Sequence, residues 1–165
     1  MGASVSLIPG GEIFPSLEKG VIDATEFSMP AIDAMMGFHK VAKYNYFPGW
    51  HQQATFFELL INKKVWNSMS PNQQATLEIL CKAATLNTLS YTESIQAKAM
   101  LNSKEQHGVK IEYFSDDILD ALKASWMEVA RELSVSSPVF KEAWEDLSAF
   151  RENYAIWEEH GFLPR

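Results

Sequence analysis

The sequence predicts an α/β fold that becomes mostly helical toward its C-terminal end. Short β-prone segments alternate with helical segments over residues 3–62. One very long helical stretch follows over residues 71–107, and two more helical segments occupy residues 115–161. Alternation of strands and helices is typical of a parallel sheet with helical crossovers, so we expect such a sheet in the first part of the chain.

The first three segments set this rhythm. Residues 3–8 (ASVSLI) predict a short strand that ends at a Pro-Gly-Gly turn. Residues 12–19 predict a short helix closed by Gly20, and residues 21–27 (VIDATEF) predict a second strand or an extended turn. Together they predict a β–turn–α–turn–β unit.

The next segments continue the α/β pattern. Residues 29–41 predict a helix weakened by an internal glycine, and residues 43–50 (KYNYFPGW) predict a strand that leads into a loop. Residues 55–62 (TFFELLIN) predict another strand, followed by a short helix or turn that carries Trp66 and Met69.

The clearest element is the long helix over residues 71–107. Ser70 is its predicted N-cap, Pro71 its first residue, and Gln73 completes a capping box. Gly108 is the predicted stop. At 1.5 Å per residue the helix would be about 50 Å long, so it either kinks or spans two domains.

The C-terminal part predicts a strand over residues 110–114 and two helices, the first capped by Ser115 and the second starting at Ser137 and ending at Gly161. The last helix carries a heavy apolar load, from which we expect self-association: Phe140, Trp144, Leu147, Phe150, Tyr154 and Trp157.

The predicted organisation has three parts. Residues 1–62 form the α/β part of a ligand-binding lobe, residues 63–109 the long spanning helix, and residues 110–165 a strand with C-terminal helices. A parallel strand normally lies inside a covered sheet, and the opening strand has no earlier partner. We therefore expect the chain to be part of a larger two-domain protein, with any export signal preceding residue 1.

Composition limits the classes of function. The chain has 165 residues, 47% of them hydrophobic and 12% aromatic, which is enough for a folded core. Its net charge of −7 disfavours binding to nucleic acid or to anionic membranes, although a small anionic ligand responds to its local site. No apolar run approaches the roughly 18 residues that would span a bilayer.

Catalytic and zinc sites find little support. The single cysteine, Cys81, lies inside the long helix, where we expect a buried structural thiol. None of the four histidines stands at a metal-binding spacing from another, and His107 and His160 fall in last helical turns, where a cation suits the dipole.

Two places do suggest binding. Glu26 and Phe27 lie at the end of a predicted strand, where ligands bind in open α/β sheets. An acid among apolar residues requires a cation or a hydrogen-bond donor. The second place is residues 44–53 (YNYFPGWHQQ), which either wall a pocket or form an aromatic core with a surface turn.

These residues also carry a resemblance. Residues 9–24 (PGGEIFPSLEKGVIDA), followed by Glu26 and Phe27, closely resemble a motif of the solute-binding proteins of tripartite ATP-independent periplasmic (TRAP) transporters, especially the keto-acid and monocarboxylate branch. Residues 39–44 (HKVAKY), Tyr46 and residues 48–51 (PGWH) match the same branch. The resemblance implies a periplasmic-binding-protein-like fold of two α/β domains, a long helix along both, and no chemistry on the ligand.

The resemblance also implies the site. In this branch a metal ion, sodium or calcium here, bridges protein and ligand carboxylate. Glu26 would supply a side-chain oxygen and Phe27 a backbone oxygen, with Gln52 as third metal ligand and Trp50 as a further ligand-binding residue. Phe27 replaces the usual Trp, and Gln52 stands where the branch often has Glu. The family's clamping arginine precedes the region that matches residue 3, and none of the three arginines matches it: Arg131, Arg151 and Arg165.

The function that follows is not enzymatic. We expect a periplasmic protein that captures a small 2-oxo or 2-hydroxy monocarboxylate, delivers it to TRAP membrane permease subunits, and forms a homodimer. Two alternatives remain at this point: a metal-assisted hydrolase using Glu26 and His51, and a helical interaction module based on the aromatic C-terminal helix.

Overall fold

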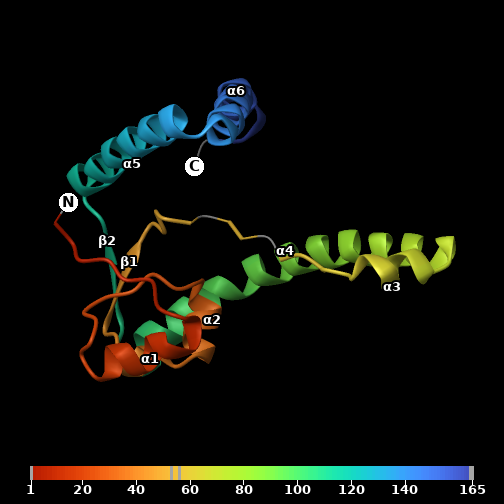
Figure 1. Ribbon diagram of the computed structural model, residues 1–165. Coiled ribbons are helices and arrows are strands. Elements are labelled where there is room, and N and C mark those ends of the chain that lie inside the picture. The colour runs from red at the N-terminus through yellow and green to blue at the C-terminus, as the bar shows by residue number, and fades with distance from the viewer. Residues whose placement is uncertain (1, 53, 56, 164–165) are drawn as a thin grey trace. The chain divides into compact units, whose positions relative to one another are not determined.

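The computed structural model describes residues 2–52, 54–55 and 57–163, and it divides into two units, Gly2–Phe114 and Ser115–Arg165. The first unit contains helices α1 (Gly10–Glu18), α2 (Pro30–Met35), α3 (Lys63–Ser68) and α4 (Pro71–His107), with a 3-10 helix η1 (Phe38–Lys40) and strands β1 (Tyr44–Phe47) and β2 (Lys110–Tyr113). The second unit contains α5 (Asp116–Ser136) and α6 (Pro138–Gly161). Figure 1 shows these elements.

The sheet of the first unit is small and parallel. Strands β1 and β2 pair in register from Tyr44 opposite Lys110 to Phe47 opposite Tyr113. The long helix α4 provides the crossover between them, so the predicted combination of parallel sheet and helical crossover is confirmed. The strand predicted over residues 43–50 is thus β1, and the one over residues 110–114 is β2.

Two predicted strands are wrong. Residues 3–8 lie outside any strand, and Val5 and Leu7 are almost fully exposed. The described part of residues 55–62 also has no regular structure, and Leu60 is 85% exposed; Phe56, within that prediction, lies outside the described residues. A strand is stable only when a neighbour pairs with its backbone, and none of the strands in the described ranges pairs with these segments. Residues 21–27 form the extended turn rather than the strand.

Gly37 divides the helix that was predicted over residues 29–41. Its backbone φ is +80°, a left-handed conformation that ends α2 and starts η1. The predicted short helices over residues 12–19 and around Trp66 are confirmed as α1 and α3.

The long helix is confirmed as one uninterrupted element of 37 residues (Figure 1). The Ser70 side chain accepts from the Gln73 backbone N–H, and the Gln73 side chain accepts from the Ser70 N–H at 2.8 Å, which completes the capping box. Gly108 ends the helix with φ +67°. Cys81 is exposed rather than buried, because the middle of α4 has no described neighbour that covers it.

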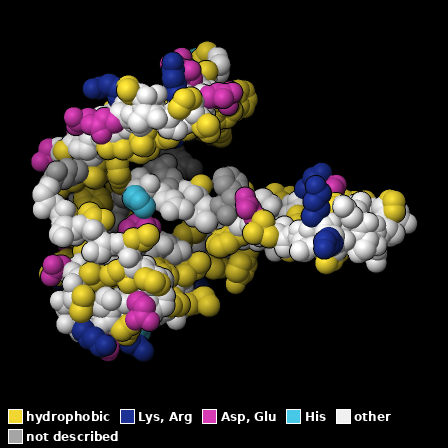
Figure 2. All heavy atoms as spheres, in the orientation of Figure 1, with side chains coloured by type: hydrophobic (Ala, Val, Ile, Leu, Met, Phe, Trp, Pro, Cys, Tyr) yellow, Lys and Arg dark blue, Asp and Glu magenta, His cyan; other side chains and the backbone are white. Residues whose placement is uncertain are grey.

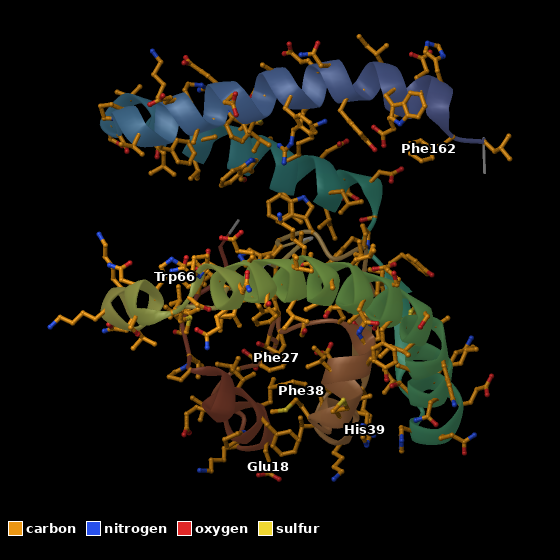
Figure 3. The ribbon with its side chains drawn as sticks, turned by 90° about the vertical axis from the view of Figure 1, so that its right-hand side faces the viewer. Glu18, Phe27, Phe38, His39, Trp66 and Phe162 are labelled. Carbon is orange, nitrogen blue, oxygen red and sulfur yellow. The ribbon has the colours of Figure 1, made fainter. Side chains whose placement is uncertain are left out.

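The core of the first unit lies where α2, η1 and the end of α4 meet. Ala31, Phe38 and Val109 are its buried apolar residues. The Phe38 ring contacts Phe27 edge-on, with centroids 4.8 Å apart, and also lies beside Phe14 at 6.2 Å. Figure 3 shows Phe27 and Phe38 close together between α1 and η1.

The second unit is a helical hairpin. Its buried residue is Ala130, and Trp126 of α5 contacts Trp144 of α6 edge-on at 5.8 Å. Phe140 stacks parallel to Trp144 at 6.3 Å. This end of α6 packs on α5, whereas Phe150 and Trp157 are 62% and 59% exposed. Figure 2 shows many such hydrophobic side chains on the visible surface.

Candidate functional site

The turn after α1 presents the acid singled out in the sequence. Glu26 lies in the extended segment between α1 and α2, and its Oε2 is 3.4 Å from Nδ1 of His51. Both side chains are more than half exposed. The loop after β1 therefore returns to the Glu26 segment, which brings together two residues that are 25 positions apart in the printed sequence. A carboxylate in this setting is free to accept a cation or a donor from solution.

The side chain of Phe27 points to the opposite side of the extended segment from that of Glu26. Its ring packs against Phe38, and Thr25, two residues earlier, donates from Oγ1 to the Glu26 carbonyl oxygen at 2.9 Å. Alternation along the extended segment sends the Glu26 carboxylate outward and the Phe27 ring inward. The phenyl ring of Phe27 has no atom that ligates a hard cation, so only its backbone oxygen is available for ligation.

A cavity of about 100 Å³ lies behind this segment, entirely within the first unit. Polar side chains that line it come from five elements or loops: Thr25, Asp33, His39, Asn45 and Ser103. Phe27, Phe38 and Met100 provide apolar wall. Tyr44 and Asn45, the first two residues of segment 44–53, lie on β1 and line this cavity.

Asp33 is the acid of this cavity. Its Oδ1 is buried and has no hydrogen-bond partner among the residues that the structure describes. Burial and, to a lesser extent, the nearby negative charge of Glu26 raise the pKa of Asp33 to about 6, against the opposing effect of a hydrogen bond from the Ser28 backbone. Sequence reasoning missed Asp33; the signal was an acid inside the otherwise apolar segment PAIDAM.

His39 is the base of the cavity. Its Nδ1 is also buried, with no hydrogen-bond partner in the described part of the chain, and its ring stacks on His107 with centroids 3.9 Å apart. Burial, followed by the positive charges of His107, Lys40 and Lys43, lowers the pKa of His39. The pairing of His39 with His107 was not predicted, because no sequence spacing connects residues from different helices.

The other predicted site residues lie apart from the cavity lining. Trp50 is half-buried, and Gln52 is exposed and donates from Nε2 to Thr55 Oγ1 at 2.7 Å. Neither has a described contact with Glu26. Among the described residues, no three His, Cys, Asp or Glu side chains are grouped to hold a metal ion.

Comparison with known proteins identifies the family. Residues 1–136 match DctP, described as bacterial extracellular solute-binding protein, family 7. A monocarboxylate 2-oxoacid-binding periplasmic protein of Nostoc sp. (strain PCC 7120) is 29% identical over 157 residues, which cover 95% of this chain and 43% of that protein.

Two solved structures are similar. A TRAP transporter solute-binding protein from Bordetella bronchiseptica matches with a TM-score of 0.82 and 32% identity over 92% of this chain and 45% of that one. Its crystal contains a mixed-occupancy dimer with copurified calcium and picolinate in one active site, the other being apo. A TRAP periplasmic solute-binding protein from Colwellia psychrerythraea, with bound calcium and pyruvate, matches with a TM-score of 0.85 and 29% identity. The match covers 94% of this chain and 48% of that one.

The chain therefore spans about half the length of the relatives that it matches. Their fold confirms the predicted partial α/β, periplasmic-binding-protein-like architecture. In the described part of the chain, no helix is long and apolar enough to cross a bilayer.

Proposed function

We propose, on the premise that this chain belongs to family 7 of the bacterial extracellular solute-binding proteins, that it forms one lobe of a receptor for small 2-oxo or 2-hydroxy monocarboxylates. The full-length protein would bind the acid in the periplasm and deliver it to the membrane subunits of a TRAP transporter. Similar proteins with bound calcium and pyruvate, or calcium and picolinate, support this ligand class. The matched family is one of solute-binding proteins, so the hydrolase hypothesis for Glu26 and His51 is not retained.

The single observation that carries the proposal is the exposed Glu26 carboxylate beside the inward-facing ring of Phe27. This arrangement leaves two oxygens available on consecutive residues, one from the Glu26 side chain and one from the Phe27 backbone. Calcium prefers such oxygen ligands and takes six to eight of them. A cation here would also offset the repulsion between Glu26 and Asp33.

Two further residues complete the proposed site. We infer that Gln52 supplies its side-chain oxygen, because its bond to Thr55 uses Nε2 and not Oε1, and that Trp50 forms part of the ligand-binding wall. Glu26 would hold a calcium ion through its carboxylate, and the Phe27 ring would fix the backbone that faces the ion. The ion would supply the positive charge that ties the solute carboxylate to the protein.

Calorimetry on the full-length protein tests this proposal. Pyruvate and related 2-oxo and 2-hydroxy acids are titrated with calcium and, separately, after chelation. We expect binding that depends on calcium and that weakens at least about tenfold in Glu26→Gln, because a neutral amide loses the charge that holds the cation. Glu18→Gln is the matched control, since Glu18 lies at the end of α1 (Figure 3). Binding of sugars in place of acids, or unchanged affinity in Glu26→Gln, would refute the assignment.

We further propose that the protein is a homodimer that uses the exposed end of α6. The apolar residues predicted as one stripe divide into two groups: Phe140 and Trp144 pack within the hairpin, while Phe150, Tyr154 and Trp157 are exposed by 62%, 43% and 59%. Burying large apolar side chains is worth roughly 1.5–3 kcal/mol each, so a second copy is a fitting partner. The dimer of the Bordetella relative supports this choice.

Sedimentation at micromolar concentration tests the dimer. Trp157→Ala should shift the protein toward monomer, whereas Glu152→Ala, an exposed change on the same helix, should not. A monomeric wild-type protein would exclude the proposed interface.

A further inference from the structure

The contact between His39 and His107 joins two elements that are distant in the sequence. His39 belongs to η1 and His107 is the last residue of α4. Their rings lie 3.9 Å apart with only 19° between their planes. Figure 3 shows His39 beside the end of α4. Because His39 lines the cavity, this stack holds one part of the cavity wall in place.

A lysine supports the same junction through the backbone. Lys43 donates from Nζ to the His39 carbonyl oxygen at 2.9 Å and to the His107 carbonyl oxygen at 3.5 Å. The His107 carbonyl lies at the C-terminal end of α4, where the helix dipole places partial negative charge. One ammonium group and one ring stack therefore connect η1 to α4.

The surroundings of His39 favour its neutral form. The charges that act on it, from Lys40 on η1, from Lys43 and from His107 on α4, are all positive or become positive. A proton on Nδ1 would sit on a buried atom with no described acceptor. Two stacked imidazolium rings would also repel each other at this separation.

Other elements around the cavity provide little negative charge that would stabilise a protonated His39. Asp33 of α2 lines the same cavity, but it is already partly protonated near pH 6. Ser103 of α4 is uncharged. Lys110 of β2 adds another cation, which donates to the Tyr44 hydroxyl at 3.3 Å.

A metal site is the competing interpretation of two adjacent histidines. Nearly parallel rings direct their nitrogen lone pairs side by side rather than toward one point, and a zinc site needs three or four converging ligands. The described residues provide no third ligand in a group with these two. Titration is the better account of the pair.

We propose that the His39–His107 stack is a pH-sensitive latch, which holds η1 against the end of α4 at neutral pH and loosens as the pH falls. The sign follows from linkage. The pKa of His39 is lower in the folded state than the ordinary value near 6.5, so the unfolded or opened state binds more protons. The latch is fully effective when the pH is above the ordinary pKa of histidine. It weakens as the pH falls from that ordinary pKa to the folded-state pKa of His39, and the weakening is complete below the folded-state pKa.

Amide hydrogen exchange and imidazole NMR on the 165-residue chain test the latch. Protection of residues 38–42 and 104–110, corrected for intrinsic exchange, is compared at about pH 7.5 and 5.0. Between these two pH values we expect protection to fall by up to about tenfold for each unit by which the pKa of His39 lies below its ordinary value. His39→Phe keeps an aromatic ring without titration and should abolish this dependence, whereas His160→Phe, in the last turn of α6, should retain it.

Two results would overturn the proposal. One is the same loss of protection in His39→Phe as in the wild type. The other is a wild-type His39 resonance that titrates at or above its ordinary pKa; this measurement decides the matter even if the variant fails to fold. Neither readout uses a solute, so the latch and the proposed receptor function can fail independently.

Discussion

The two halves of α4 differ in what covers them. From Thr92 to Ser103, half-buried residues recur at helical spacing and face α2 and η1: Thr92, Ile95, Gln96, Ala99, Met100 and Ser103. Residues 78–91 are all exposed, although they include Ile79, Leu80, Leu86 and Leu89. The same helix thus has a packed stretch toward its C-terminal end and a middle stretch whose apolar side chains are exposed. Local signals form a helix, but only distant parts of a chain can bury it.

The largest difference between the two halves should appear in core truncation. Phe38→Ala removes a buried ring from the cluster beside the packed half and should lower the free energy of unfolding by about 3–5 kcal/mol. Leu86→Ala, on the exposed half, should cost less than about 0.5 kcal/mol. Urea unfolding followed by circular dichroism measures both. Equal costs would mean that Leu86 has a partner in solution, which would remove the contrast.

A smaller difference should appear in polar contacts. Gln96 accepts the Ala31 backbone N–H at 3.0 Å and so satisfies the start of α2, whose own N-cap residue makes no described side-chain capping bond. Gln96→Ala should therefore cost about 1–3 kcal/mol, because a partly buried N–H loses its acceptor. Asn87→Ala, on the exposed half, is the matched control and should be close to neutral. Equal effects in urea unfolding would show that Gln96 does not tie the helices together.

The smallest effect concerns the end of the packed half. Gly108 has φ +67° and nothing within 4 Å of an added Cβ, so Gly108→Ala tests the backbone alone. We expect a loss of about 1–2 kcal/mol in the same unfolding assay. Gly11→Ala is also unobstructed but has no left-handed backbone, and it should be neutral or stabilising. An unchanged stability in Gly108→Ala would exclude the left-handed stop.

The same division explains what could be predicted from the sequence. The capping box at Ser70 and the stop at Gly108 are local signals, and they predicted α4 with its observed bounds. The strands expected over residues 3–8 and 55–62 failed because strands depend on partners that local sequence does not specify. Cys81 was placed in a core that the exposed half of α4 lacks.

The candidate site shows the same contrast between local signals and contacts that join distant residues. Glu26 and Phe27 were identified from their place at the end of a predicted strand and then through family resemblance, and their assignment as ligands stays a proposal. The approach of His51 to Glu26 and the stacking of His39 on His107 are non-local, so no spacing in the sequence predicted them. Asp33, the acid inside the apolar segment of α2, could have been recognised from the sequence, but it was not included among the predicted site residues.

We propose that this chain is one lobe of a two-lobe receptor, whose site needs the other lobe and its expected arginine. Calorimetry with pyruvate and calcium on the 165-residue chain and on the full-length protein tests it directly. The account predicts that the chain alone binds at least about 100-fold more weakly, since the carboxylate then lacks its bidentate partner. Equal affinity of the chain and the full-length protein would contradict it.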